Sequence, residues 1–135
     1  MRPVLVWPAR GANGREGHLA SGSPMILLVD DDDTVRETSA DMLQELGYTV
    51  MQAANGPDAL DMLDTHPGFD VMVTDIRMPG MTGLELSDVA ANRHAELKII
   101  LISGYFLPQV IKRRFLQKPF RTCELDQAIR AEMTA

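Results

Sequence analysis

Short apolar runs that alternate with helical segments restrict the possible folds of this chain more than any other feature of the sequence. The first run, MILLV at residues 25–29, is continuously apolar, as expected for a strand buried on both faces. Four more candidate strands follow it: YTVMQA at 48–53, FDVMVT at 69–74, LKIILI at 97–102 and RFLQ at 114–117. Strands that alternate with helices predict an α/β fold with a parallel sheet and helices on both faces.

The segments between these runs have helical periodicity and recognisable ends. Thr34, with Glu37 three residues later, resembles a capping box, and Gly47 is a suitable terminator. The second helix is expected to open at Pro57, the third to run from about Leu84, and the last to begin near Thr122. The residues expected on the buried helix faces are Val35, Met42, Leu43, Leu46, Leu60, Leu63, Leu125, Ile129 and Met133.

Polar side chains follow four of the five predicted strands at the point where each strand ends. They are Asp30 and Asp31 after the first strand, Asp75 after the third, Ser103 after the fourth and Lys118 after the fifth. In a parallel α/β sheet, ligands bind outside the carboxyl ends of the strands. We therefore expect carboxylates, a hydroxyl and an ammonium group to converge on one rim.

Such a cluster of carboxylates suggests a bound divalent cation. Two carboxylates about 5 Å apart repel by roughly 3 kcal/mol at an effective dielectric constant of about 20. Mg²⁺ prefers hard oxygen ligands and commonly takes one or two carboxylates together with phosphate oxygens and water. An aspartate beside such an ion can itself act as a nucleophile and form an aspartyl-phosphate, so the pattern favours phosphoryl transfer.

Four motifs, in this order, resemble the receiver domain of two-component response regulators. They are ILLVDDDDTVR, VTDIRMPGMTGLEL, LISGY and FLQKPF. The resemblance covers about residues 25–133. It implies a flavodoxin-like (βα)5 fold, a doubly wound five-stranded parallel sheet with strand order 2-1-3-4-5. It also implies a histidine kinase or a histidine phosphotransfer protein as partner, Mg²⁺ as cofactor, and no enzymatic activity beyond self-catalysed phosphotransfer and autodephosphorylation.

The resemblance also assigns roles to individual residues. Asp75 corresponds to the phosphoacceptor, Asp31 to the direct Mg²⁺ ligand and Asp30 to a ligand that acts largely through water. The backbone carbonyl of Arg77 completes the metal ligands, Ser103 meets the phosphoryl oxygen, Lys118 pairs with Asp75, and Pro119 follows through a cis bond. Phe115 takes the position of the switch aromatic, although a plain core residue is an equally good interpretation. Asp32 and Asp33 are interpreted as solvated residues at the start of the first helix, where the helix dipole favours negative charge.

The connection between the fourth and fifth strands departs from the family pattern. Only fifteen positions separate Ser103 from Lys118, and about ten residues form the crossover, near the minimum for parallel strands. The fourth helix is therefore expected to be short or missing, as in receivers of hybrid histidine kinases and some stand-alone receivers. We expect phosphorylation to change a local patch at residues 103–115, and the protein to be a monomer or weak dimer.

Composition restricts the partners and the compartment. A net charge of −6 argues against a nucleic-acid-binding surface, and no apolar run approaches the roughly 20 residues that cross a membrane. Cys123 is the single cysteine, which suits a reducing, cytoplasmic setting. Residues 1–24 are rich in glycine and proline and are expected to form a flexible, disordered arm, with the receiver domain at 25–135.

Two other functions fit part of the sequence. LLVDDDDT also matches the Asp-x-Asp-x-Thr motif of haloacid dehalogenase-type phosphatases, with Asp30, Asp32 and Thr34 as its members. That interpretation leaves the TDIRMPGMTG segment unexplained and lacks a further acidic motif after Lys118. The second alternative is a degenerate receiver that acts only as a binding module, against which the complete set of acidic residues, serine and lysine argues.

Overall fold

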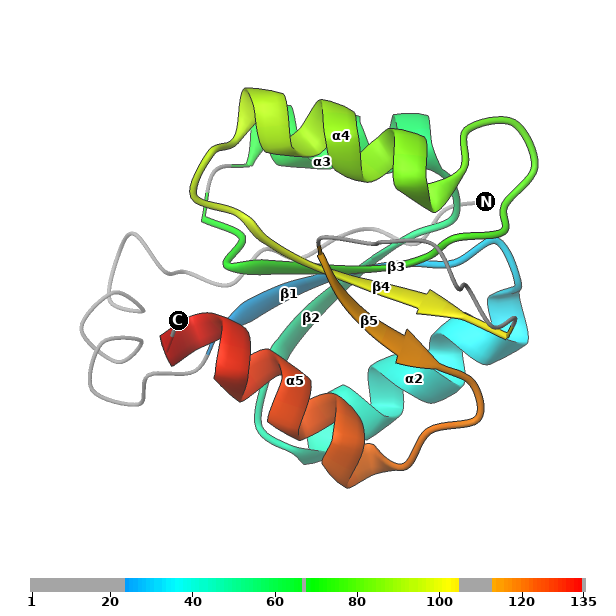
Figure 1. The fold of residues 1–135 in the computed structure, drawn as a ribbon, viewed down its shortest axis with the longest axis vertical. Coiled ribbons are helices and arrows are strands. Elements are labelled where there is room, and N and C mark those ends of the chain that lie inside the picture. The colour runs from blue at the N-terminus through cyan, green and yellow to red at the C-terminus, as the bar shows by residue number, and fades with distance from the viewer. Residues whose placement is uncertain (1–23, 67, 105–112, 135) are drawn as a thin grey trace.

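The computed structural model describes residues 24–66, 68–104 and 113–134, which form one parallel sheet with four helices. The strands are β1 (Met25–Val29), β2 (Thr49–Ala53), β3 (Val71–Asp75), β4 (Lys98–Ser103) and β5 (Arg114–Gln117). Their order across the sheet is β2-β1-β3-β4-β5, with every neighbouring pair parallel. The doubly wound fold predicted from the sequence and its strand order are therefore confirmed (Figure 1).

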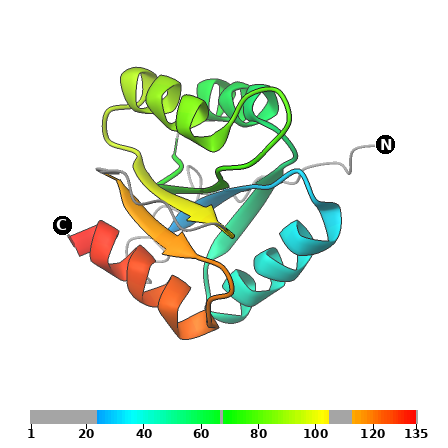
Figure 2. The same ribbon diagram turned by 45° about the vertical axis from the view of Figure 1, so that its right-hand side comes forward.

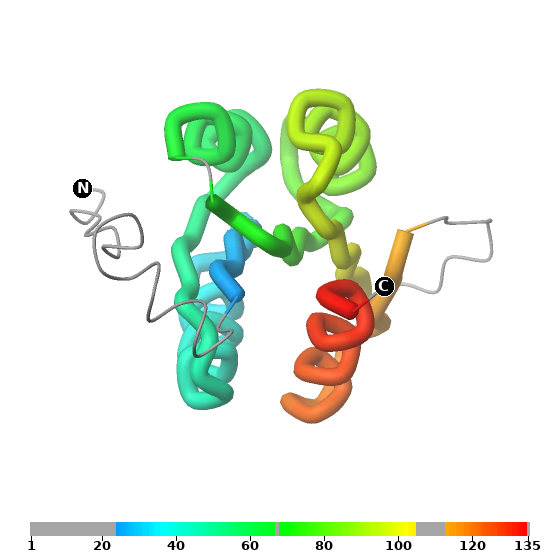
Figure 3. Tube along the Cα trace, turned by 90° about the vertical axis from the view of Figure 1, so that its left-hand side faces the viewer, coloured from blue at the N-terminus to red at the C-terminus, as the bar shows by residue number. Residues whose placement is uncertain are grey.

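The helices divide equally between the two faces of the sheet. Helices α3 (Gly56–Thr65) and α4 (Gly83–Arg93) cover one face, and α2 (Asp33–Glu45) and α5 (Thr122–Thr134) cover the other (Figures 1 and 2). The view from the side shows the two pairs, one on each side of the strands (Figure 3). The predicted short or missing helix between β4 and β5 falls largely on residues 105–112, outside the described residues.

Alternating side chains of the strands feed two separate cores. In β1, for example, Met25, Leu27 and Val29 belong to one cluster and Ile26 and Leu28 to the other. The cluster under α3 and α4, here called the α3/α4 core, also contains Met51, Met62, Leu63, Met72, Met78, Leu86 and Leu101. The cluster under α2 and α5, the α2/α5 core, contains Leu43, Tyr48, Val71, Val73, Ile100, Ile102, Leu125 and Ile129. Both faces of the sheet are therefore buried, as the continuous apolar runs require.

The start of α2 differs from the sequence prediction. The N-cap is Asp32 rather than Thr34, because the Asp32 carboxylate accepts a hydrogen bond from the backbone N–H of Val35 at 3.0 Å. The helix therefore begins at Asp33. Val35 is 36% exposed and Met133, in the last turn of α5, is 39% exposed, so both predictions of a buried side chain are wrong. Both residues lie in a terminal turn of their helix.

The predicted flexible arm, residues 1–24, lies outside the described residues except for Pro24, so that prediction stays a prediction. Within the described part of the chain, no helix is both long and apolar enough to cross a membrane.

Candidate functional site

Three carboxylates meet at the carboxyl ends of β1 and β3. Asp30 and Asp31 follow β1 directly, and Asp75 is the last residue of β3. One oxygen from each carboxylate lies within 4.8 Å of the other two. Within the described residues this is the only group of three or more acidic, histidine or cysteine side chains close enough to share a metal ion. The convergence expected from the sequence is therefore present.

Asp30 is the buried member of this cluster, with 6% of its surface exposed. Its carboxylate accepts a hydrogen bond from the backbone N–H of Asp32 at 2.9 Å. Burial raises the pKa of Asp30 above its usual value, and the negative charges of Asp75 and Asp31 act in the same direction, while the Asp32 hydrogen bond and Lys118 oppose them. These surroundings disfavour the ionised Asp30 carboxylate, and a compensating cation would offset that cost.

Lys118 approaches the cluster from the end of β5. Its ammonium nitrogen lies 3.6 Å from Asp75 Oδ2 and 3.7 Å from Asp30 Oδ2, longer than direct hydrogen bonds. The backbone N–H of Lys118 donates to the carbonyl of Ser103 at 2.7 Å, which joins the ends of β4 and β5. Ser103 is 1% exposed, and the Lys118–Pro119 peptide is cis, as the resemblance implied.

The turn between β3 and α4 holds Asp75 through close backbone packing. The N–H of Ile76 donates to the carbonyl of Ile102 at 2.8 Å, and the N–H of Gly83 donates to the carbonyl of Ile76 at 2.9 Å. A Cβ on Gly83 would lie 2.2 Å from the Asp75 carbonyl oxygen, so only glycine fits there. No local sequence pattern predicts this contact, because it depends on how α4 meets β3.

Helix α4, which follows this turn, begins with a capping box. The Thr82 hydroxyl accepts from the N–H of Glu85 at 3.1 Å, and the Glu85 carboxylate accepts from the N–H of Thr82 at 3.0 Å. The four-residue TGLE segment therefore fixes where α4 starts, and with it the approach of Gly83 to Asp75.

The run of four aspartates divides into three structural roles. Asp30 and Asp31 lie in the cluster, Asp32 caps α2, and the Asp33 carboxylate accepts from the Arg36 guanidinium at 2.7 Å. Asp32 and Asp33 are exposed at the helix start, as expected, but each has a defined partner. The phosphatase interpretation needs Asp32 at the reacting centre, whereas its carboxylate binds the backbone of α2.

Two of the residues assigned from the resemblance lie at the margin of the site. Arg77 is exposed in the turn after β3. Phe115 is half-buried, pairs in register with Leu101 of β4 and packs against the α3/α4 core. Its packing is compatible with the switch role and with a plain core role.

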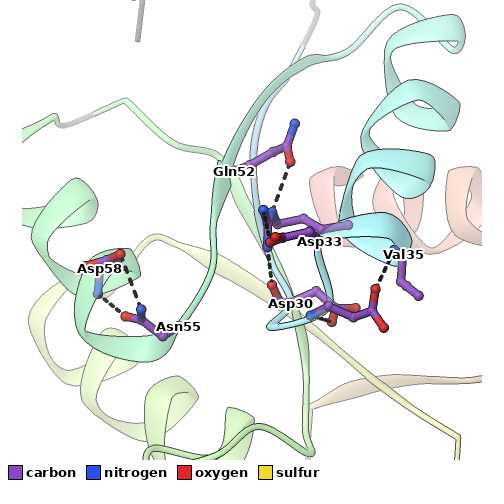
Figure 4. Close-up of polar contacts among 8 residues, drawn as sticks. Asp30, Asp33, Val35, Gln52, Asn55 and Asp58 are labelled. Carbon is purple, nitrogen blue, oxygen red and sulfur yellow. Dashed lines mark hydrogen bonds and ion pairs between the residues drawn. The ribbon is translucent and has the colours of Figure 1, made fainter. Parts of the chain in front are cut away.

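Arg36 is a residue near the site that the sequence analysis did not consider. Its guanidinium donates to the backbone carbonyl of Asp30 at 2.7 Å and to the Gln52 side chain of β2 at 3.0 Å (Figure 4). The spacing of Asp33 and Arg36, three residues apart on one helix, is a weak sequence signal for the ion pair alone. The contact with Gln52, sixteen residues away, has no local signal.

The residues of the cluster fit Mg²⁺. All candidate side-chain donors are carboxylate oxygens, the hard ligands that Mg²⁺ prefers. Three carboxylates and the single Lys118 ammonium leave two uncompensated negative charges, which matches a divalent ion. The protein groups that could hold the ion are thus on the rim together with the lysine that could neutralise a bound phosphoryl group.

Comparisons with known proteins identify the same kind of domain. The response regulator receiver domain family matches residues 26–130. The sensor kinase CckA of Brucella abortus is 38% identical over 118 residues, which cover 82% of this chain and 12% of the kinase. The receiver protein CpdR of the same organism is 39% identical over 80 residues, 59% of this chain and 66% of CpdR.

Solved structures agree with these sequence matches. The response regulator TrrA of Thermotoga maritima, solved with Mg²⁺ and BeF, has a TM-score of 0.75 and 31% identity, covering 81% of this chain and 98% of TrrA. This chain spans only a small part of the sensor kinase and about two thirds of CpdR. The chain belongs to the response regulator receiver domain family and is a receiver of two-component signalling systems.

Proposed function

We propose that Asp75 accepts the phosphoryl group. Its side chain is 12% exposed at the end of β3, close to Lys118 and to the other two carboxylates. In the reaction, an Asp75 carboxylate oxygen attacks phosphorus, the P–N bond to the donor histidine breaks, and the leaving imidazole nitrogen takes up a proton. The single observation that carries this proposal is the convergence of three carboxylates and one ammonium at the end of β3.

The other residues of the rim bind and neutralise. Asp30, Asp31 and Asp75, with the backbone carbonyl of Arg77, would hold Mg²⁺, which when bound offsets the charge of the transferring phosphoryl group. Lys118 neutralises the charge that remains on Asp75 and then on the phosphate, and the Ser103 hydroxyl donates to a phosphoryl oxygen. Water then hydrolyses the acyl phosphate at the same site, which restores the Asp75 carboxylate and releases inorganic phosphate.

We infer that the phosphodonor is a histidine kinase or a histidine phosphotransfer protein. The similarity to a receiver within a sensor kinase and to a single receiver protein supports this kind of partner. A cytoplasmic location follows from such a partner. We further propose that phosphorylation acts on residues 103–115 and leaves the protein a monomer or weak dimer, with Ser103 and Phe115 as the switching residues.

The experiment that tests the phosphoacceptor is phosphorylation with acetyl phosphate and Mg²⁺, followed by intact mass. The wild type should gain one phosphoryl group that alkali or hydroxylamine removes. Asp75→Asn keeps the shape but removes the nucleophile, so it should gain none, while Asp32→Asn should behave like the wild type. Stoichiometric phosphate on Asp75→Asn would refute the assignment, and an unreactive wild type would favour a binding module.

The metal site has a separate test that does not depend on phosphorylation. Mg²⁺ binds only the native state and should raise the melting temperature by mass action. Asp31→Ala should remove most of this rise and, by relieving repulsion, should not lower the melting temperature in EDTA. An unchanged response to Mg²⁺ in Asp31→Ala would exclude Asp31 as a ligand.

A further inference from the structure

Among the described residues close to the acidic cluster, the Arg36 side chain makes the most hydrogen bonds. It lies in the first turn of α2 with 12% of its surface exposed. Its guanidinium makes three hydrogen bonds, to the Asp30 carbonyl at 2.7 Å, the Gln52 side-chain oxygen at 3.0 Å and the Asp33 carboxylate at 2.7 Å (Figure 4). Three bonds from one planar group fix both its position and its plane.

The carbonyl that Arg36 holds belongs to the peptide bond between Asp30 and Asp31. The orientation of this peptide sets the direction in which the Asp31 side chain leaves the backbone. Gln52 fixes the other side of the guanidinium to β2, which pairs with β1 at Leu28. Arg36 thus connects the peptide between two candidate metal ligands to the rigid sheet.

The two carboxylates differ in what else holds them. The Asp30 carboxylate is buried, accepts from the Asp32 N–H and faces Lys118. Asp31 is exposed, and in the described part of the chain its carboxylate has no hydrogen bond or ion pair. The position of the Asp31 carboxylate therefore depends on its backbone, and that backbone depends on Arg36.

We propose that Arg36 is a positioning residue for the metal site, which orients Asp31 by holding the Asp30–Asp31 peptide. This inference rests on the proposed function, because it assumes that Asp31 binds Mg²⁺. In this proposal Arg36 binds neither the phosphoryl group nor the metal itself. Loss of the guanidinium should weaken metal binding through geometry, with little effect on the phosphotransfer step once metal is bound.

The direction of the effect separates positioning from simple electrostatics. Arg36 carries a positive charge near three carboxylates. By Coulomb's law alone, its removal should strengthen the binding of a divalent cation. Weaker Mg²⁺ binding after neutralisation of Arg36 therefore points to lost orientation and not to lost charge.

The experiment measures the Mg²⁺ concentration at half-saturation, from isothermal titration and from the rise in melting temperature over an EDTA reference. Groups that orient metal ligands typically contribute 10- to 100-fold in affinity, so Arg36→Gln should raise the half-saturation concentration about tenfold. The phosphorylation rate with acetyl phosphate at saturating Mg²⁺ should stay within about threefold of the wild type. Arg93→Gln is the matched control, since Arg93 also donates to an aspartate at 2.7 Å but at the far end of α4.

Arg36→Lys keeps the positive charge but lacks the planar guanidinium, so it should weaken Mg²⁺ binding nearly as much as Arg36→Gln. It replaces Arg36→Gln in the test if Arg36→Gln folds poorly. Unchanged or tighter Mg²⁺ binding in both variants would overturn the proposal, as would equal weakening in Arg93→Gln or full rescue by lysine. A wild type that fails to bind Mg²⁺ would overturn both the proposed metal site and this inference. If the wild type binds Mg²⁺ and the Arg36 variants bind it equally well, only the inference about Arg36 is overturned.

Discussion

The two cores on opposite faces of the sheet are built from different side chains. The α3/α4 core contains five buried methionines, Met25, Met51, Met62, Met72 and Met78. The buried members of the α2/α5 core include no methionine in the described residues, and half of them are isoleucine or valine. Methionine has three rotatable side-chain bonds and adapts to irregular space, whereas β-branched side chains are stiff.

This difference matches the positions of the functional groups. The α2/α5 side includes the helix that carries Arg36, whose guanidinium holds the acidic corner after β1. The α3/α4 side receives Phe115, the proposed switching aromatic. The acidic corner after β1 is thus attached to the stiff layer, and Phe115 packs against the adaptable layer.

The largest expected effect is the loss of stability when a large side chain in either core is shortened to alanine. Ile100 and Met72 lie on the central strands, are fully buried and face opposite cores. Ile100→Ala should lower the free energy of unfolding by about 4 kcal/mol, and Met72→Ala by about 2–3 kcal/mol, because flexible neighbours can partly fill the cavity. Urea unfolding of both variants measures the difference. Equal losses would show that the two cores are equally rigid.

A second contrast tests the polar link that closes the α2/α5 layer. The Tyr48 hydroxyl, in the turn after α2, donates to the Asp126 carboxylate of α5 at 2.5 Å. Tyr48→Phe should cost about 2 kcal/mol of unfolding free energy at pH 7, the scale of a hydrogen bond to a charged group.

The pH dependence of this link has a defined sign. Burial and Asp126 raise the pKa of Tyr48 to about 12. The stabilisation is complete below pH 10, the ordinary tyrosine value, and is lost as pH rises through about 12. The gap between wild type and Tyr48→Phe should therefore shrink between pH 10 and 12. A constant gap over this range would contradict the role of the hydroxyl.

A third, smaller effect concerns the acidic rim between the two layers. Asn at position 30 retains an acceptor for the Asp32 N–H but removes a buried charge. In EDTA at pH 7, Asp30→Asn should be more stable than the wild type by about 1 kcal/mol. The pKa of Asp30 is higher in the folded state than its ordinary value. As the pH falls through the folded pKa, Asp30 takes up a proton, and the wild type regains the stability that the buried charge costs. The gain is complete below the ordinary pKa of aspartate.

The advantage of Asp30→Asn should therefore fade toward pH 4, and saturating Mg²⁺ should reverse the order of stability at pH 7. Thermal unfolding in EDTA and in Mg²⁺ at both pH values measures this. A wild type that is more stable than Asp30→Asn in EDTA would show that Lys118 already compensates the buried charge fully.

The smallest expected effect is at the polar link on the α3/α4 side. Arg113 donates to the buried Ser87 hydroxyl at 3.2 Å and lies 3.4 Å from Asp88. Both ionic partners are partly or largely exposed, so Arg113→Gln should change the unfolding free energy by less than about 0.5 kcal/mol. A cost as large as that of Tyr48→Phe would mean that the α3/α4 layer is also held by a strong polar link.

Local patterns in the sequence were sufficient for the fold and for the composition of the rim. Short, mainly apolar runs predicted the five strands to within two residues at each end. The run is continuous in β1, which is buried on both faces, whereas the edge strands β2 and β5 contain polar residues and are only partly buried. Asp30, Asp31, Asp75, Ser103 and Lys118 could be assigned to one rim because the carboxyl ends of parallel strands meet at one edge.

Only the tertiary structure decided how the aspartate run divides and which groups support it. In the structure Asp32, and not the predicted Thr34, is the N-cap of α2, so the helix begins earlier than expected. The exposure of Val35 and Met133 depends on where each helix ends on the sheet. The contact of Arg36 with Gln52 joins α2 to β2, and that of Gly83 with Asp75 joins α4 to β3. Periodicity reports what is local to one element, whereas these contacts depend on strand register and on how each helix packs against its neighbours.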